Sequence, residues 1–375
     1  MPSHAADRGL AVTSMGTVLR THSRVRLVDV AATAGVHVST VSRVLNEDPG
    51  LSIRDTTRDR ILTAARRTGY RPNVLAQALQ RSRTGALAMV VPMVRNPIWS
   101  VVERGAIDRA ASRGFAMLLV SEPADAPRPS THYAPLVEQS RVDGLVLANA
   151  TGARSRSATA LAVPHVYLNR RGNRPGHDVV MDEEGAVALF LQEVDAARRR
   201  SVVLIDGPRD IDTVRRRSLA ARRLGSSLGL RVRVVHAAAT EAGGWESTER
   251  VLGGGVRPDA IGVGSLPQLH GVVARLRVSG VRIQAQLSLV SFDEDDCLPY
   301  LGIPITSVAM PLAELGAAGV DAVLDQIAGL PARDVLVDAP MRLVRHDSSP
   351  TRRPPDPALS RRGSAALTPA PLPPG

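Results

Sequence analysis

The chain has 375 residues, of which 44% are hydrophobic and 22% are charged, the composition of a globular protein with two or three domains. Its apolar runs are too short to span a bilayer and no apolar segment follows a basic start at the N-terminus, which disfavours a membrane or secreted protein, so we expect a cytoplasmic one. All 47 basic residues are arginine and there is one cysteine, which excludes a lysine-dependent phosphate-binding loop, kinase site or Schiff base, an internal disulfide and a cysteine-rich metal site.

The net charge of +11 is concentrated near the N-terminus. Residues 24–83 contain eleven arginines and five acidic residues, a net charge of +6, whereas residues 84–345 carry only +2. A basic segment on a nearly neutral body is the electrostatic pattern of a nucleic-acid-binding domain. A basic surface that faces solvent and has no partner is the alternative, and charge alone does not separate the two.

Residues 27–80 have the apolar spacing of short helices joined by turns. The first and third helices are expected to end at Gly35 and Gly69, because glycine tolerates the left-handed backbone that follows a helix. Pro72 interrupts the chain, and Asn73 is placed to cap a last short helix. The expected helices cover residues 27–34, 39–45, 58–68 and 73–80.

The first two of these helices have the features of a helix–turn–helix motif. Ala31 is small enough for the two helices to cross, Gly35 makes the turn, and several valines supply a buried face. The outer face of the second helix then carries hydrogen-bonding side chains, which can enter the major groove of DNA and contact base edges. An ordinary helical hairpin is the alternative, and the spacing and the basic charge together disfavour it.

From residue 85 onward, short apolar runs alternate with amphipathic stretches such as 99–113 and 185–198. Strands that alternate with helices indicate parallel sheets with helices on both faces. About 250 residues of this pattern are too many for one small sheet, so we expect two similar lobes. The predicted strands are residues 86–91, 116–120, 144–147, 165–168, 202–205, 232–235, 260–263 and 288–291.

The segment LVDVAATAGVHVSTVSRVLN, residues 27–46, resembles the DNA-binding domain of the lactose-repressor (LacI/GalR) family. GYRPNVLAQAL, residues 69–79, resembles the linker and hinge helix of that family. The likeness covers residues 24–345 and is looser in the body, where it lies in VVPMVRNP (90–97), RVDGLVL (141–147), VPHVYLNRR (163–171), RPDAIGVGS (257–265), SLVSFDE (288–294) and PITSV (304–308). It implies an α/β protein with a small all-helical head and a two-lobed body with parallel sheets, like the periplasmic binding proteins.

Composition and resemblance together predict five segments. They are a disordered tail at 1–23, the helix–turn–helix domain at 24–70, a linker with the hinge helix at 71–84, a two-lobed effector-binding and dimerisation domain at 85–345, and a disordered tail rich in proline and arginine at 346–375. The resemblance implies a transcriptional regulator, most often a repressor, that binds a palindromic operator as a homodimer and responds to a small molecule between its lobes. It implies no enzyme activity, cofactor or metal. The alternative is a solute-binding module without a DNA function, against which the basic head and the missing signal peptide argue.

The resemblance assigns DNA contacts residue by residue. Val38, Ser39 and Arg43 match positions that contact bases, and an arginine can bond two acceptors of one guanine. His37 departs from the family, which usually has serine or threonine there, so we expect a weaker cap on the second helix. The residues that match phosphate-contacting positions are Thr40, Ser42 and Asn46, and those on the hinge face that enters the minor groove are Ala76 and Leu79.

The resemblance also places an effector pocket, at Arg95, Asn169, Arg217 and Ser265. Met93 and Leu266 stand where the family usually has acidic residues, so we expect the carboxylates that bind sugar hydroxyls to be largely missing. With arginine retained, the sequence predicts a carboxylate or phosphate compound as the effector, or none. A pocket that has drifted and binds nothing is the second possibility.

Other signals in the body have simpler explanations. Ser227 lies in a G-x-S-x-G pattern, but a helix enters this turn and a strand leaves it, the reverse of a nucleophile elbow, and no base is evident. The acidic run 293–296 is either a cation site or an acidic loop after a strand, of which the loop is the commoner. The three glycines at 253–255 are expected to form a surface turn. Trp99 is expected either in the pocket or in the dimer interface.

Overall fold

The computed structural model describes residues 25–46, 48, 50–70, 83–92, 96–122, 133–148, 163–172, 175–255 and 257–349. The chain forms two compact units, Met1–Ser82 and Arg83–Gly375. In the first unit, called the head below, three helices are described: α1 (Leu27–Ala34), α2 (Val38–Leu45) and α3 (Asp55–Thr68). The last predicted helix, 73–80, lies outside the described residues. None of the described helices is long and apolar enough to cross a membrane.

The helices of the head follow the predicted pattern closely. Gly35 and Gly69 both have the left-handed backbone expected of them, with φ of 62° and 68°. The predicted second helix begins one residue late, at Ser39 instead of Val38. The predicted third helix begins three residues late, because the residues 55–57 that start α3 are polar and add no apolar period. One core joins the three helices and consists of Val30, Ala31, Ala34, Val41, Val44, Ile61, Ala64 and Ala65.

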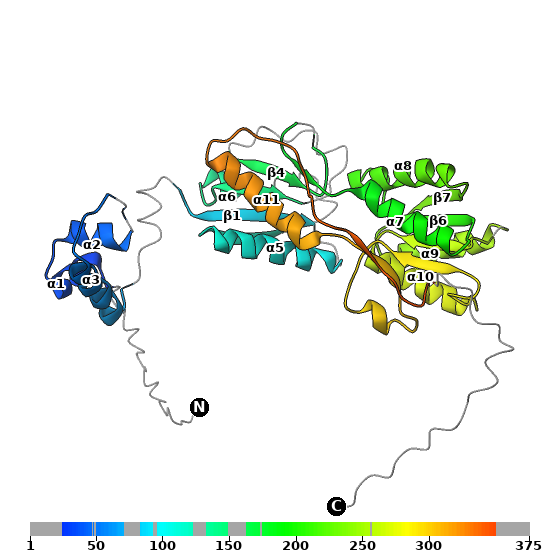
Figure 1. Cartoon of the computed structure of the whole chain (residues 1–375), viewed down its shortest axis with the longest axis horizontal. Coiled ribbons are helices and arrows are strands. Elements are labelled where there is room, and N and C mark those ends of the chain that lie inside the picture. The colour runs from blue at the N-terminus through cyan, green and yellow to red at the C-terminus, as the bar shows by residue number, and fades with distance from the viewer. Residues whose placement is uncertain are drawn as a thin grey trace, which may run out of the picture. The chain divides into compact units, whose positions relative to one another are not determined.

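The second unit, called the body below, contains two lobes with one six-stranded sheet each (Figure 1). The sheet of the first lobe is parallel throughout and has the order β2-β1-β3-β4-β5-β11. The sheet of the second lobe has the order β7-β6-β8-β9-β10-β12, and only β12 is antiparallel. The shared order of the first five strands confirms the prediction of two similar lobes.

The strands of the first lobe are β1 (Ala86–Pro92), β2 (Ala116–Glu122), β3 (Gly144–Leu147), β4 (His165–Leu168), β5 (Asp178–Val180) and β11 (Val335–Leu336). Those of the second lobe are β6 (Ser201–Asp206), β7 (Arg231–His236), β8 (Ala260–Val263), β9 (Ser288–Ser291), β10 (Thr306–Ala309) and β12 (Arg342–Val344). All eight predicted strands are present. The prediction from apolar runs lacks β5, β11 and β12, which have only two or three residues each, and β10, where buried Thr306 and Ser307 interrupt the apolar run.

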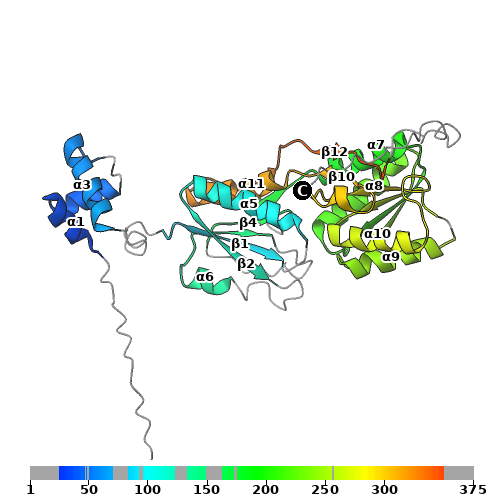
Figure 2. The same ribbon diagram turned by 90° about the horizontal axis from the view of Figure 1, so that it is seen from below.

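Helices cover both faces of each sheet, as predicted (Figure 2). In the first lobe, α5 (Ile98–Ser112) and α11 (Leu312–Ile327) lie on one face and α6 (Ala134–Glu138) on the other. In the second lobe, α7 (Glu183–Ala196) and α8 (Asp212–Ser227) lie opposite α9 (Glu241–Gly253) and α10 (Leu266–Val278), and a 3-10 turn, Leu298–Tyr300, follows β9. Each lobe therefore has an apolar core on both sides of its sheet.

The chain passes between the lobes three times, after β5, after β10 and after β11. Met310, in the second of these crossings, packs against the cores of both lobes. Crossings of this kind form a hinge about which two lobes can close on a ligand.

The C-terminal boundary of the body corrects one prediction. The tail was expected to begin at residue 346, but Ser348 is fully buried. Its hydroxyl donates to the backbone oxygen of Leu289 at 2.6 Å and accepts from the N–H of Thr306 at 2.8 Å. Composition does not reveal these bonds, because a polar segment can be held against two strands by hydrogen bonds alone. The body therefore extends at least to residue 349.

Candidate functional site

The outer face of α2 presents the side chains expected of a DNA-reading helix. Val41 and Val44 are buried in the core of the head, whereas Val38, Ser39 and Arg43 are exposed. All three predicted base-contacting residues thus share the exposed face of α2. Such a helix has the length and the polarity to lie in the major groove.

The N-terminus of α2 is capped by His37. Its ring Nδ1 accepts a hydrogen bond from the N–H of Ser39 at 3.3 Å and lies 2.7 Å from the hydroxyl oxygen of the same residue. The predicted weakness of this cap agrees with the long 3.3 Å bond. Histidine therefore still satisfies one of the free N–H groups of the first helical turn.

Arg43 is held in place by a residue that sequence analysis did not single out. Its Nε donates to Oδ2 of Asp48 at 2.7 Å, and the other carboxylate oxygen of Asp48 accepts from the N–H of Gly50 at 2.9 Å. The hydrogen bond from Arg43 is the main cause that lowers the pKa of Asp48, and the bond from Gly50 adds to it. Within the described part of the chain, the two terminal nitrogens of Arg43 have no hydrogen bond, so the edge that reads guanine stays available.

The three predicted phosphate-contacting residues are half-buried at the edge of the same helix. Asn46 ends α2, and its side-chain nitrogen donates to the hydroxyl of Ser42 at 3.4 Å. Thr40 lies two residues before Ser42. The predicted minor-groove residues Ala76 and Leu79 lie outside the described residues.

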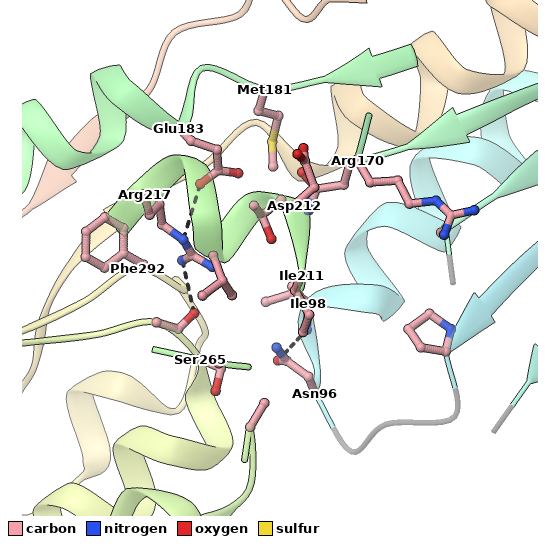
Figure 3. A pocket seen from close by; sticks show the side chains of 18 of the residues that line it. Asn96, Ile98, Arg170, Met181, Glu183, Ile211, Asp212, Arg217, Ser265 and Phe292 are labelled. Carbon is pink, nitrogen blue, oxygen red and sulfur yellow. Dashed lines mark hydrogen bonds and ion pairs between the residues drawn. The ribbon is translucent and has the colours of Figure 1, made fainter. Parts of the chain in front are cut away.

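The second candidate site is a cavity of about 450 Å³ between the two lobes of the body (Figure 3). Three predicted effector residues, Asn169, Arg217 and Ser265, line it, and Arg95 lies outside the described residues. Trp99 also lines the cavity, which agrees with one of its two predicted places. The wall further includes Met181, Met310 and Leu312, which belong to or adjoin the crossings between the lobes, so a ligand here would touch the hinge.

Arg217 is already neutralised by buried carboxylates. Its Nε lies 3.4 Å from Oε2 of Glu183 and 3.3 Å from Oδ2 of Asp206, and its Nη1 donates to the backbone oxygen of Gly264 at 3.1 Å. The guanidinium also lies over the ring of Phe292, 5.3 Å from its centroid. Figure 3 shows Arg217 beside Glu183 and Phe292 at one end of the pocket. Its charge is therefore not free for an anionic ligand.

The expectation that carboxylates are largely missing from the pocket is wrong. Five acidic residues line it: Glu183, Asp206, Asp210, Asp212 and Asp293. The acidic residues that the family usually has at 93 and 266 are absent, but the loss at 266 is offset across the loop, since the N–H of buried Leu266 donates to Oδ2 of Asp293 at 3.0 Å. Asp206 ends β6, and Asp293 follows the end of β9 by two residues. The carboxyl ends of parallel strands meet at one edge of a sheet, so an acidic residue at such an end could have indicated these two pocket carboxylates from the sequence.

Asp293 is the member of the acidic run 293–296 that faces the pocket. Its Oδ2 also accepts from the side-chain nitrogen of Asn96 at 3.1 Å, and burial raises its pKa to about 6. Glu294 instead bonds the hydroxyl of Ser307, and Asp295 accepts from the N–H of Cys297 at 2.9 Å. The carboxylates thus serve separate partners, and no group of three His, Cys, Asp or Glu residues in the described part of the chain could hold a metal.

Asn169 follows β4 with a left-handed backbone, φ 56°, and its Oδ1 is buried without a hydrogen-bond partner among the described residues. A strained asparagine with an unused acceptor at a pocket wall is a candidate ligand contact. Ser227 has no such setting, because it is the last residue of α8 and its hydroxyl donates to the backbone of Arg223 at 3.2 Å. The glycines at 253–255 lie at and after the end of α9, as a surface turn would.

Comparison with known proteins matches both units of the chain. Residues 26–73 match the model of the bacterial regulatory proteins of the lacI family, and residues 194–349 match that of a periplasmic binding protein-like domain. The chain is 30% identical to the HTH-type transcriptional regulator PtxS of Pseudomonas plecoglossicida, over 90% of this chain and 99% of that protein. It is 26% identical to the ribose operon repressor of Escherichia coli K12, over 80% and 92%. A crystal structure of the lac repressor dimer bound to operator and the anti-inducer ONPF has a TM-score of 0.74 at 23% identity, over 87% and 99%.

Proposed function

Because the chain belongs to the LacI family of bacterial regulatory proteins, we propose that it is a repressor whose dimer binds a palindromic operator and responds to a small molecule held between its lobes. The observation that carries the proposal is the exposed face of α2, where Arg43 is fixed by Asp48 with its terminal nitrogens free. A regulator of this kind acts where the DNA is, in the cytoplasm, and needs no catalytic activity.

The proposal divides the exposed face of α2 by the type of contact. Val38, Ser39 and Arg43 contact base edges, and the guanidinium of Arg43 bonds O6 and N7 of one guanine. The residues that hold the phosphate backbone and so set the register of the helix are Thr40, Ser42 and Asn46. In the segment 71–84, Ala76 and Leu79 enter the minor groove, where an apolar wedge favours a base step that unstacks cheaply.

The proposed effector site uses the pocket of the body. Asn169, Ser265 and Arg217 contact the ligand or hold the groups that do, and Met181 and Met310 place the ligand against the crossings between the lobes. A ligand that binds the closed arrangement better than the open one shifts the lobes toward closure, and the linker transmits this shift to the heads. Affinity for the operator therefore changes when the pocket is filled.

Selection of DNA from a random pool by the full-length protein tests this function. We expect a near-palindromic consensus, with half-sites related by the two-fold axis of the dimer. Arg43→Ala is expected to abolish selection of one base in each half-site. Arg60→Ala is the matched control, because Arg60 is an exposed arginine on α3 and not on the recognition helix α2. This variant is expected to lower the affinity for DNA without changing the consensus.

The second candidate, a solute-binding module without a DNA function, is favoured only by the two-lobed body with its pocket. It predicts ligand binding with no selected DNA sequence. A pool that yields no consensus, together with a ligand that stabilises the body, would decide for it.

A further inference from the structure

Arg170 is a buried arginine that the contacts described so far do not use. It follows Asn169 after β4, lines the pocket between the lobes, and is only 9% exposed. Among the described residues it forms no hydrogen bond and no ion pair, and its Nε is completely shielded without an acceptor. Burial accordingly lowers the pKa of Arg170 from its usual value. A guanidinium in this state costs free energy, and proteins normally pair such a group.

The surroundings hold Arg170 in place and balance its charge only in part. The buried carboxylates of Asp178 and Glu122 attract it, but neither forms an ion pair with it among the described residues. Its guanidinium lies over the ring of Tyr167, 4.8 Å from the centroid. Gly172 permits this arrangement, because a Cβ there would come within 2.3 Å of the Tyr167 ring. The buried carboxylate of Asp178 accepts a hydrogen bond from the N–H of Gly172 at 2.7 Å and forms no ion pair with Arg170. The arginine is thus fixed by an aromatic surface, and its donors have no hydrogen bond within the part of the chain that the structure describes.

The two ends of the pocket differ in the partners that they offer. Figure 3 shows Arg170 extending on the side opposite to Arg217, whose charge is balanced by Glu183 and Asp206. At the Arg217 end, Oδ1 of Asp293 has no hydrogen bond among the described residues, and near Arg170 Oδ1 of Asn169 is equally unused. One end therefore offers a cation and the rest of the wall offers acceptors.

We propose that Arg170 binds the anionic group of the effector, and that the effector is a small phosphate or carboxylate compound whose remaining part carries hydroxyl groups. The anion accepts two N–H groups of the guanidinium, which are charge-assisted hydrogen bonds. The hydroxyls donate to Asn169 and Asp293. Arg217, the residue that the sequence favoured for the anion, instead keeps its two carboxylates and orders the far wall. This inference rests on the proposed function only in taking the pocket as the effector site.

The test measures ligand binding by the full-length protein without DNA, so it does not depend on operator recognition. Thermal shift and calorimetry compare probes built on one carbon skeleton: glucose, glucosamine, glucuronate and glucose 6-phosphate, with inorganic phosphate as the bare anion. We expect the anionic probes to raise the melting temperature and glucose and glucosamine to do so far less. Glucuronate against glucose 6-phosphate distinguishes a carboxylate from a phosphate ligand.

Arg170→Gln and Arg171→Gln form the matched pair of variants, because Arg171 lines the same pocket but is exposed. We expect Arg170→Gln to weaken binding of the anionic probes by about tenfold or more, as loss of a charge-assisted fork does, and Arg171→Gln to weaken it by less than about threefold. Without ligand, Arg170→Gln should melt no lower than the wild type, since a buried cation without a partner has been removed.

Each other outcome overturns the proposal. Equal stabilisation by glucose and by the anionic probes, or no stabilisation by any anion, excludes an anion site in the pocket. Unchanged binding of the anions to Arg170→Gln assigns them to another residue. A lower melting temperature or failed folding of ligand-free Arg170→Gln would show that the arginine is structural. None of these results touches DNA binding, which the operator selection measures separately.

Discussion

Replacement of Asp293 by asparagine is expected to make the protein more stable above pH 6 and to remove the part of its acid-range pH dependence that Asp293 causes. Asp293 is buried, and this raises its pKa from the usual 3.8 to about 6. Asparagine keeps an oxygen that can accept from the side chain of Asn96 and from the N–H of Leu266. The substitution therefore removes the charge and preserves the hydrogen bonds.

The magnitude follows from the two pKa values. An increase of about two units corresponds to about 3 kcal/mol at roughly 1.4 kcal/mol per unit. Between these values the folded protein binds more protons than the unfolded chain, so stability falls as the pH rises through about 4 to 6, and the whole penalty is present above about pH 6. Asp293→Asn should escape this loss, which corresponds to a melting temperature about 6–12 °C higher than that of the wild type at pH 7.5.

Thermal or urea unfolding of both proteins from pH 4 to pH 8 measures the difference. Asp210→Asn is the control, because Asp210 is an exposed carboxylate on the wall of the same pocket, and its curve should follow the wild type. If the wild type and Asp293→Asn lose stability in parallel across this range, the buried carboxylate of Asp293 does not carry the penalty and the reasoning fails.

Three further outcomes are expected. Arg217→Met should lower the free energy of unfolding by about 3–5 kcal/mol, because it leaves the buried carboxylates without their cation; chemical denaturation at pH 7.5 checks this, and a loss below about 1 kcal/mol would contradict it. Arg43→Ala should cost about 1–3 kcal/mol of binding free energy per half-site in titrations of single-base operator variants. Asp48→Asn, which keeps the acceptor for Gly50, should relax the same base preference in the wild type but have no further effect in Arg43→Ala. An unchanged preference profile in both single variants would show that Arg43 does not contact a base. Residues 73–80 should be protected from hydrogen exchange only in the presence of operator, because so short a helix is marginal by itself, and strong protection in the free protein would argue against a hinge that forms on DNA.

Local pattern was sufficient to predict the head. Its helices are set by apolar spacing over a few turns and end at Gly35 and Gly69, where glycine alone adopts the backbone freely. The exposed face of α2 is the complement of its buried face, so burial of Val41 and Val44 by itself presents Ser39 and Arg43 outward. Asp48 escaped notice because its partnership with Arg43 depends on how the loop after α2 turns back.

The body could be predicted as alternating strands and helices, because parallel strands buried on both faces are continuous apolar runs. Its short edge strands and residues 346–349 could not, since they are held by hydrogen bonds to neighbours distant in the sequence rather than by an apolar pattern.

The pocket shows most clearly what the sequence alone does not determine. The resemblance placed Asn169, Arg217 and Ser265 in the pocket, and all three line it. Which arginine is free to act is a different question. Arg217 is neutralised by Glu183 and Asp206, which are 34 and 11 positions away in the chain. Arg170 is buried against Tyr167, and among the described residues it forms no ion pair with the carboxylates of Asp178 and Glu122 that attract it. The sequence identifies which residues carry a charge. Whether that charge is neutralised depends on neighbours that only folding brings within about 4 Å, where Coulomb attraction and desolvation are both strong.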